Sequence, residues 1–86
     1  MASPEIFLPR MKWFYEQMEG KMLLPKNIAK GDWRESRIRD LYVLLIGEVR
    51  ELEAELYSSG PHDNIVKECA DIANFAMMIA DRVNSG

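Results

Sequence analysis

Apolar residues recur at spacings of three and four in three separate stretches of this chain. That spacing places them on one face of an α-helix, and no stretch alternates with period two for long enough to indicate a strand. The first stretch begins at Pro4 or at Pro9, because either proline can occupy a first helical turn, and ends near Met22. Its stripe, which we expect to face the core, consists of Met11, Phe14, Tyr15, Met18 and Met22.

The second and third stretches are longer and predict two helices joined by a short turn. One runs from about residue 36 to about residue 58, and its stripe consists of Leu41, Leu45, Val49, Leu52 and Leu56. The other starts with Asp63 or Asn64 as its cap and ends near Val83. Its stripe consists of Ile65, Cys69, Ile72, Ala76, Ile79 and Val83. Ser58-Ser59-Gly60-Pro61 stops one helix before the next begins, so we expect an antiparallel hairpin.

Residues 23–35 are predicted to be an irregular connection, because Pro25 and Gly31 interrupt the helical pattern. The fold predicted is therefore all-α: a single domain over residues 1–86, with a long helical hairpin and an N-terminal helix. A chain of 86 residues cannot hide stripes of this width by itself. We expect a homodimer or a dimer of dimers that completes a four-helix-type bundle.

Composition and charge narrow the class of protein. The chain is 48% hydrophobic and 29% charged, as in folded globular proteins, and its formal net charge is −3, which disfavours binding to a nucleic-acid polymer. The longest apolar run, residues 41–46, is too short to cross a membrane. Residues 1–9 do not resemble a signal peptide, and Cys69 is the only cysteine, so we expect a cytoplasmic protein without intrachain disulfides.

Four acidic residues lie inside the two long helices as two pairs, Glu48 with Glu51 and Glu68 with Asp71. A spacing of three puts both acids of a pair on one helical face. At about 100° per residue, the members of each pair lie roughly 60° and 120° to the same side of the apolar stripe. In an antiparallel hairpin, two such flanks can face a common groove.

Carboxylates gathered in one groove would repel one another and raise some of their pKa values, unless a cation neutralised them. Oxygen ligands without histidine or cysteine favour Mg²⁺, with Mn²⁺ as a second candidate. Acidic pairs are also common on solvated helix faces, so this alternative stays open. Their repetition on consecutive helices favours a shared metal site.

These motifs resemble those of the MazG-like, all-α nucleoside triphosphate pyrophosphatase superfamily. The resemblance rests on Glu48-x-x-Glu51, sixteen intervening residues and Glu68-x-x-Asp71, and it covers residues 30–83. It implies magnesium-dependent hydrolysis of a (deoxy)nucleoside triphosphate to the monophosphate and pyrophosphate, in nucleotide-pool housecleaning. It also implies that the four acids are catalytic and hold the metal. The resemblance further implies that one of these acids, or the neighbouring Glu55, assists in activating water, and it does not distinguish among them.

Other residues are candidates for binding the nucleotide. Trp33 can stack on a base, and Lys30 and Arg34 can reach phosphates; a tryptophan lid over a small core is the alternative. Asn74 can donate to a phosphate or a sugar, or be structural. Phe75 and Met78 lie on the acidic flank and can line a base pocket or pack in the core. We expect His62, in the interhelical turn, to be exposed.

Two other functions compete with this one. The first is a non-catalytic helical dimerisation or interaction module. It would associate through the same apolar stripes, and its acids would serve only as solvated surface groups. A ferritin-like di-iron protein requires Glu-x-x-His pairs, which the single histidine, His62, does not form. Because few residues follow the third predicted helix, we expect a second subunit to contribute to the pocket.

Overall fold

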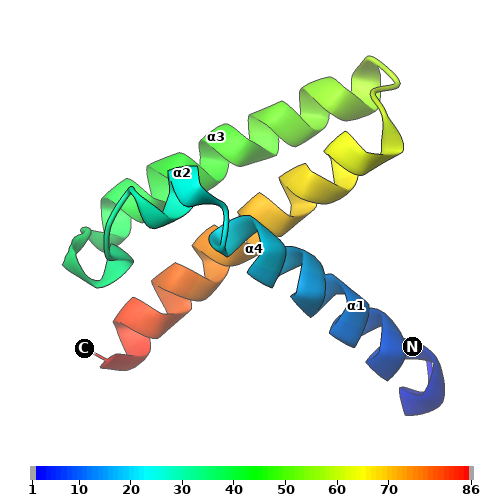
Figure 1. Ribbon diagram of the computed structural model, residues 1–86, viewed down its shortest axis with the longest axis horizontal. Coiled ribbons are helices and arrows are strands. Elements are labelled where there is room, and N and C mark those ends of the chain that lie inside the picture. Colours follow the sequence, from blue (N-terminus) through cyan, green and yellow to red (C-terminus); the bar gives the residue numbers. More distant parts are fainter. Residues whose placement is uncertain (1, 86) are drawn as a thin grey trace.

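The two longest helices form a hairpin in the computed structural model, which describes residues 2–85 (Figure 1). Helix α3, Ile38–Tyr57, and helix α4, His62–Ser85, run antiparallel and make the largest interface between elements. The described residues form helices, turns and bends without any strand, so the prediction of an all-α chain is confirmed. Within the same part of the chain, none of these helices combines the length and apolarity that a membrane span needs.

The ends of the hairpin differ slightly from the predicted ones. Helix α4 begins at His62, because the carbonyl of Pro61 accepts hydrogen bonds from the amides of Asn64 (3.0 Å) and Ile65 (3.2 Å). The prediction that Asp63 or Asn64 caps this helix is therefore wrong by two or three residues, because the cap position falls on Pro61. In the turn, Ser59 adopts a left-handed conformation with φ of 55°, and the amide of Gly60 donates to the carbonyl of Glu55.

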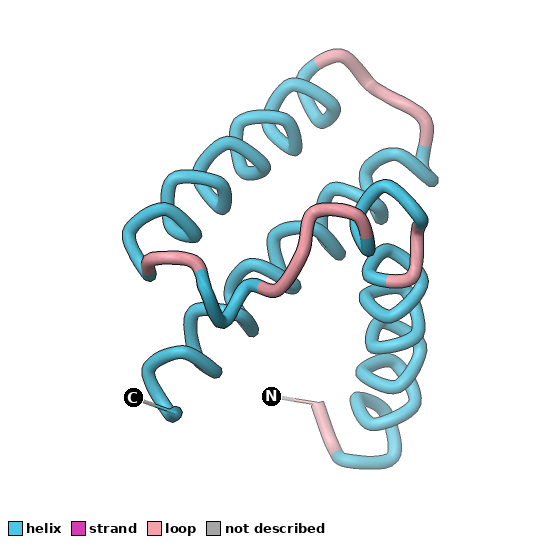
Figure 2. The backbone as a smooth tube through the Cα atoms, turned by 60° about the vertical axis from the view of Figure 1, so that its left-hand side comes forward, coloured by secondary structure: helices cyan, strands magenta, loops and turns pink. Residues whose placement is uncertain are grey.

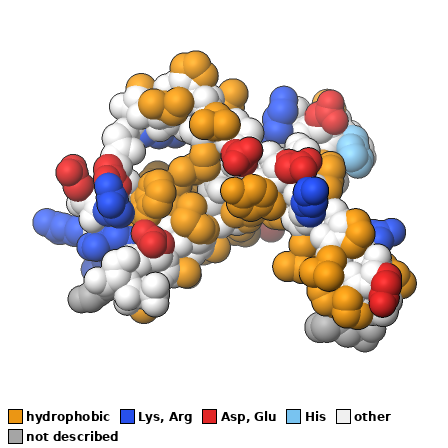
Figure 3. Space-filling model, turned by 60° about the horizontal axis from the view of Figure 1, so that its bottom comes forward, with side chains coloured by type: hydrophobic (Ala, Val, Ile, Leu, Met, Phe, Trp, Pro, Cys, Tyr) orange, Lys and Arg blue, Asp and Glu red, His pale blue; other side chains and the backbone are white. Residues whose placement is uncertain are grey.

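Helix α1, Pro4–Met22, starts at the earlier of its two candidate prolines and contains Pro9 within it. Its C-terminal part crosses the middle of α4, whereas its N-terminal half extends away from the hairpin as an arm (Figures 1 and 2). The expectation that its stripe faces a core is met only in part among the described residues, because Phe14, Met18 and Met22 are half-buried. Met11 and Tyr15 are 61% and 60% exposed, and apolar side chains cover much of this arm in Figure 3.

The connection between α1 and α3 is more regular than predicted. It contains the single-turn helix α2, Pro25–Ile28, and the 3₁₀ helix η1, Trp33–Glu35. Pro25 stands in the first turn of α2, and the Asp32 side chain caps η1 by accepting from the amide of Arg34. One turn is too short to show helical periodicity in a sequence, which is why these elements were not predicted.

The core of the described chain is small. Only Leu41 of α3 and Ala70 and Asn74 of α4 are buried, while many large apolar side chains are exposed. Two hydrogen bonds hold the end of the connection against α4. Trp33 Nε1 donates to Asp81 Oδ2 at 3.0 Å, and Arg82 Nε donates to the carbonyl of Ser36 at 3.2 Å. The antiparallel hairpin, rather than a large core, sets the positions of the acidic side chains of α3 and α4.

Candidate functional site

Three of the predicted acids converge between the two helices of the hairpin. Glu48 projects from α3, and Glu68 and Asp71 project from α4. One carboxylate oxygen from each lies within 4.8 Å of the other two, and all three side chains are partly buried. Because α3 and α4 are antiparallel, flanks that are far apart in sequence face one another here.

The electrostatics of this cluster are unfavourable without a cation. Glu48 Oε2 and Glu68 Oε2 are both buried and have no hydrogen-bond partner. Burial, the facing carboxyls of Glu68 and Glu51 and the charge of Asp71 together raise the pKa of Glu48 to about 8, and burial contributes most. Burial is also the main cause that raises the pKa of Glu68. Closely spaced oxygen ligands with unsatisfied lone pairs fit a hard divalent cation such as Mg²⁺.

Glu51 and Glu55 occupy different surroundings from these three acids. Glu51 is more exposed and lies outside the group of three, yet it lines the same cavity. Its carboxyl contributes to the raised pKa of Glu48 and of Glu68. The Glu55 carboxylate lies against Gly60 at the interhelical turn and does not line the cavity. This placement argues against a role for Glu55 in activating water.

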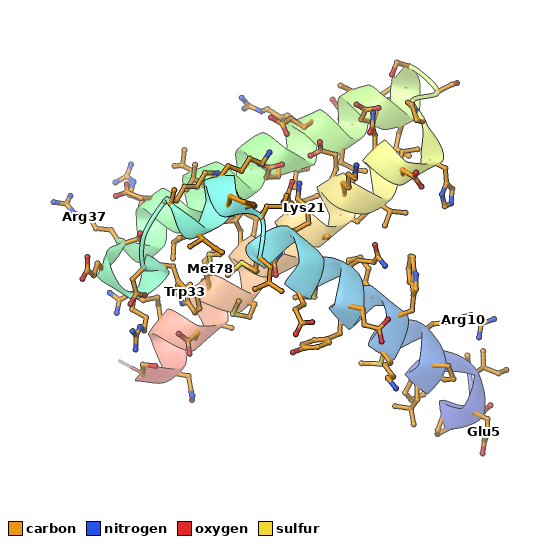
Figure 4. All side chains as sticks on the ribbon, in the orientation of Figure 1. Glu5, Arg10, Lys21, Trp33, Arg37 and Met78 are labelled. Carbon is orange, nitrogen blue, oxygen red and sulfur yellow. The ribbon has the colours of Figure 1, made fainter. Side chains whose placement is uncertain are left out.

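A cavity of about 500 Å³ opens over the acidic cluster. The hairpin forms one wall, and the C-terminal end of α1 with the following connection forms the other. Three lysines line this second wall: Lys21, Lys26 and Lys30. The apolar lining includes Met22, Ile28, Trp33, Phe75 and Met78. Figure 4 shows Lys21 near the crossing of α1 and α4, and Trp33 and Met78 together on the side of η1. The cavity therefore has an acidic wall, a basic wall and an apolar end.

Lys21 contacts the acidic cluster directly. Its Nζ lies 3.2 Å from Asp71 Oδ2, and the two side chains are only 15% and 20% exposed. Sequence reasoning missed Lys21, Lys26 and Asn27, because they lie in α1 and the connection, outside the helices that carry the acids. The sequence did offer one signal for a basic wall, because three lysines lie within ten residues shortly before the hairpin.

The predicted nucleotide-binding residues differ in whether they line the cavity and in which groups they contact. Lys30, Trp33 and Phe75 line the cavity. Asn74 also lines it, but it is 5% exposed and its Nδ2 donates to the carbonyl of Met18 at 3.0 Å, which favours the structural alternative. Trp33 is partly buried, and its indole donates to α4, so the ring is held at the edge of the cavity.

Arg34 does not line the cavity, contrary to the expectation that it reaches phosphates. Its side chain is 70% exposed and pairs with Asp32 at 2.6 Å. Hydrogen bonds from Arg34 lower the pKa of Asp32 to about 2. The two residues thus form a local pair that caps η1. His62 is exposed, as predicted.

Comparison of the chain with protein-family models, with curated proteins and with solved structures finds no match. The resemblance to the MazG-like superfamily therefore stays a prediction, and the cavity with its side chains is the observation that bears on function.

Proposed function

We propose that this chain hydrolyses a (deoxy)nucleoside triphosphate to the monophosphate and pyrophosphate with the help of Mg²⁺, Mn²⁺ being a possible substitute. The observation that carries the proposal is the convergence of Glu48, Glu68 and Asp71 within 4.8 Å of one another, facing a cavity with a lysine-bearing wall. Two of these acids have a buried oxygen without a hydrogen-bond partner. An acidic wall opposite a basic wall suits a metal–polyphosphate complex.

The side chains of the cavity would have different roles in the reaction. Glu48, Glu68 and Asp71 would hold the cation, which neutralises phosphate charge and stabilises the charge that develops on the leaving pyrophosphate. Lys26 and Lys30 supply positive charge to the phosphates from the opposite wall. Glu51, at the exposed edge of the cluster, can accept a proton from the attacking water.

The apolar end of the cavity suits a base. Trp33, Phe75 and Met78 line it together, and an aromatic ring offers a stacking surface for any nucleobase. The hydrogen bond from Trp33 to Asp81 fixes one of these rings before a ligand arrives, which reduces the conformational entropy lost on binding.

A nucleotide panel tests the proposal. Purified protein is incubated with each (deoxy)nucleoside triphosphate, with Mg²⁺ and with a chelator, and pyrophosphate is measured separately from orthophosphate. We expect magnesium-dependent release of pyrophosphate and monophosphate in equal amounts. Release of orthophosphate alone, or equal turnover with the chelator, would contradict the proposed reaction.

We also propose that the chain works as a homodimer or a dimer of dimers in the cytoplasm, in the housecleaning of nucleotide pools. The support is the apolar surface that the described chain leaves exposed, on α1 above all. The same surface favours a second candidate function, a non-catalytic helical dimerisation module. Magnesium titration separates the two, because such a module would show no metal-dependent increase in melting temperature.

A further inference from the structure

Lys21 occupies an unusual position, because it reaches the acidic cluster from another element of the fold. Its ammonium group lies 3.2 Å from Asp71 Oδ2, and both side chains are largely shielded from water. Asp71 is also one of the three acids whose oxygens converge. A lysine and a divalent cation would therefore compete for the same carboxylate.

Two side-chain amides fix the backbone that carries this lysine. Asn74 Nδ2 donates to the carbonyl of Met18, one turn before Lys21. Asn27 Nδ2 donates to the carbonyl of Lys21 itself at 2.7 Å. Asn74 lies one turn after Asp71 on α4, so the hydrogen bond and the ion pair join the same turns of the two helices. The ammonium group is thus held close to the cluster by the docking of α1.

The other two lysines of the cavity do not share this arrangement. Lys26 and Lys30 are exposed, and within residues 2–85 neither forms an ion pair. They line the opposite wall and can meet an incoming anion without leaving a partner. Only Lys21 must exchange one anionic partner for another.

We propose that Lys21 is an internal counter-cation that weakens divalent-cation binding at Asp71 until a polyphosphate draws the lysine away. The cation and the polyphosphate then bind cooperatively, each raising the affinity for the other. Charge explains the coupling. Without a polyphosphate, the ammonium group repels the cation and occupies one of its ligands; a polyphosphate supplies several negative oxygens that accept the ammonium group instead. This inference rests on the proposed function, because it regulates the same metal site.

Mn²⁺ binding to the whole chain tests the inference without any measurement of activity. Mn²⁺ is titrated into wild type, Lys21→Met, Lys21→Arg and the control Lys12→Met, and bound metal is followed by electron paramagnetic resonance. Lys12 lies on α1, is exposed and does not line the cavity. We expect Lys21→Met to bind Mn²⁺ about tenfold more tightly than wild type, because a nearby positive charge is removed. Lys21→Arg and Lys12→Met should stay close to wild type.

The cooperative part is measured by melting temperature with Mn²⁺, with inorganic tripolyphosphate and with both. In wild type, the increase with both should exceed the sum of the separate increases, and Lys21→Met should lose most of this excess. Circular dichroism confirms that each variant is folded, and Lys21→Gln, which keeps a hydrogen-bond donor near Asp71, replaces Lys21→Met if that variant unfolds.

The outcomes separate this inference from the proposed function. If wild type binds no Mn²⁺ with or without tripolyphosphate, the proposed metal site is wrong and the inference falls with it. If wild type binds Mn²⁺ but the neutral variant binds it equally or more weakly, Lys21 only positions Asp71, and the inference alone is overturned.

Discussion

Helices α4 and α1 both carry apolar residues at helical spacing, but the structure covers them to different extents. Helix α4 packs against α3, α1 and η1, and it contributes two of the three buried residues of the described chain, Ala70 and Asn74. Helix α1 has no buried residue, and its N-terminal half extends away from the other elements of residues 2–85 (Figure 2). A periodic stripe shows which face of a helix is apolar, whereas the number of neighbouring elements decides whether that face is covered.

The candidate site lies where these two regions meet. Helix α4 supplies Glu68 and Asp71, and the end of α1 supplies Lys21. The well-packed helix therefore carries two of the three clustered acids, while the arm of α1 leaves large apolar side chains exposed. Substitutions in the two regions should accordingly affect different measurements.

The largest effect is expected from the acids of the hairpin. Glu48→Gln, Glu51→Gln, Glu68→Gln and Asp71→Asn should each lower the rate of pyrophosphate release by about a hundredfold or more, because each removes a charge that acts on the reaction. Far-ultraviolet circular dichroism should remain unchanged. Glu53→Gln and Asp63→Asn are matched controls, since both acids are exposed and neither lines the cavity. Variants of the four acids that stay active in proportion to folded protein would instead support the solvated-face alternative.

The next effect concerns assembly through the arm of α1. Met11→Lys and Tyr15→Lys should weaken self-association about tenfold to a hundredfold each, because burying one large apolar side chain contributes about 1.5–3 kcal/mol. Sedimentation over a range of protein concentrations measures this change. Ala54→Lys introduces the same charge at an exposed position of α3 and should leave assembly intact. A wild-type chain that is monomeric at micromolar concentration would remove the basis of this prediction.

A smaller effect is expected where α1 docks on α4. Asn74→Ala removes the hydrogen bond to the Met18 carbonyl and most of a buried side chain. The free energy of unfolding should fall by about 2 kcal/mol. Urea denaturation measures this change, and Asn84→Ala, at an exposed position of α4, is the control. Equal stability of the two variants would show that α1 is held in place by other contacts.

The smallest effect is expected from the repulsion within the metal-free cluster. Glu48→Gln should raise the free energy of unfolding by about 1 kcal/mol at pH 9 with a chelator present, because water partly screens the charge that it removes. The pKa of Glu48 is raised from 4.5 to about 8 in the folded chain, so folding favours the protonated form. Stability contributed by this group is present below pH 4.5 and is lost as the pH rises through about 8.

At pH 5 the folded wild type therefore already carries a neutral Glu48, and the advantage of Glu48→Gln should become small. Thermal melting of the two proteins at pH 5 and pH 9 tests this. If Glu48→Gln stabilises the fold equally at pH 5 and at pH 9, the charge of Glu48 is not the cause of the stabilisation.

Much of the fold could be predicted from local sequence. The stripes from Leu41 to Leu56 and from Ile65 to Val83 predicted α3 and α4, because an amphipathic helix repeats its pattern over several turns. Helices α2 and η1 could not be predicted, since a single turn shows no repeat. The sequence also could not decide whether the first helix begins at Pro4 or at Pro9, because both prolines are compatible with a first turn. Only the structure shows that α1 begins at Pro4.

The same division holds for the site. The sequence by itself determined that Glu48, Glu68 and Asp71 flank the apolar stripes of two consecutive helices, because side-chain direction along a helix follows from its fixed rotation per residue. Only the tertiary structure decided that Lys21 joins this cluster, that Asn74 is committed to the backbone of α1 and that Arg34 pairs with Asp32 outside the cavity. These contacts depend on the angle at which α1 crosses α4 and on the path of residues 23–35. Neither can be predicted from the spacing of apolar residues along a single helix, because each results from packing between residues that are distant in the chain.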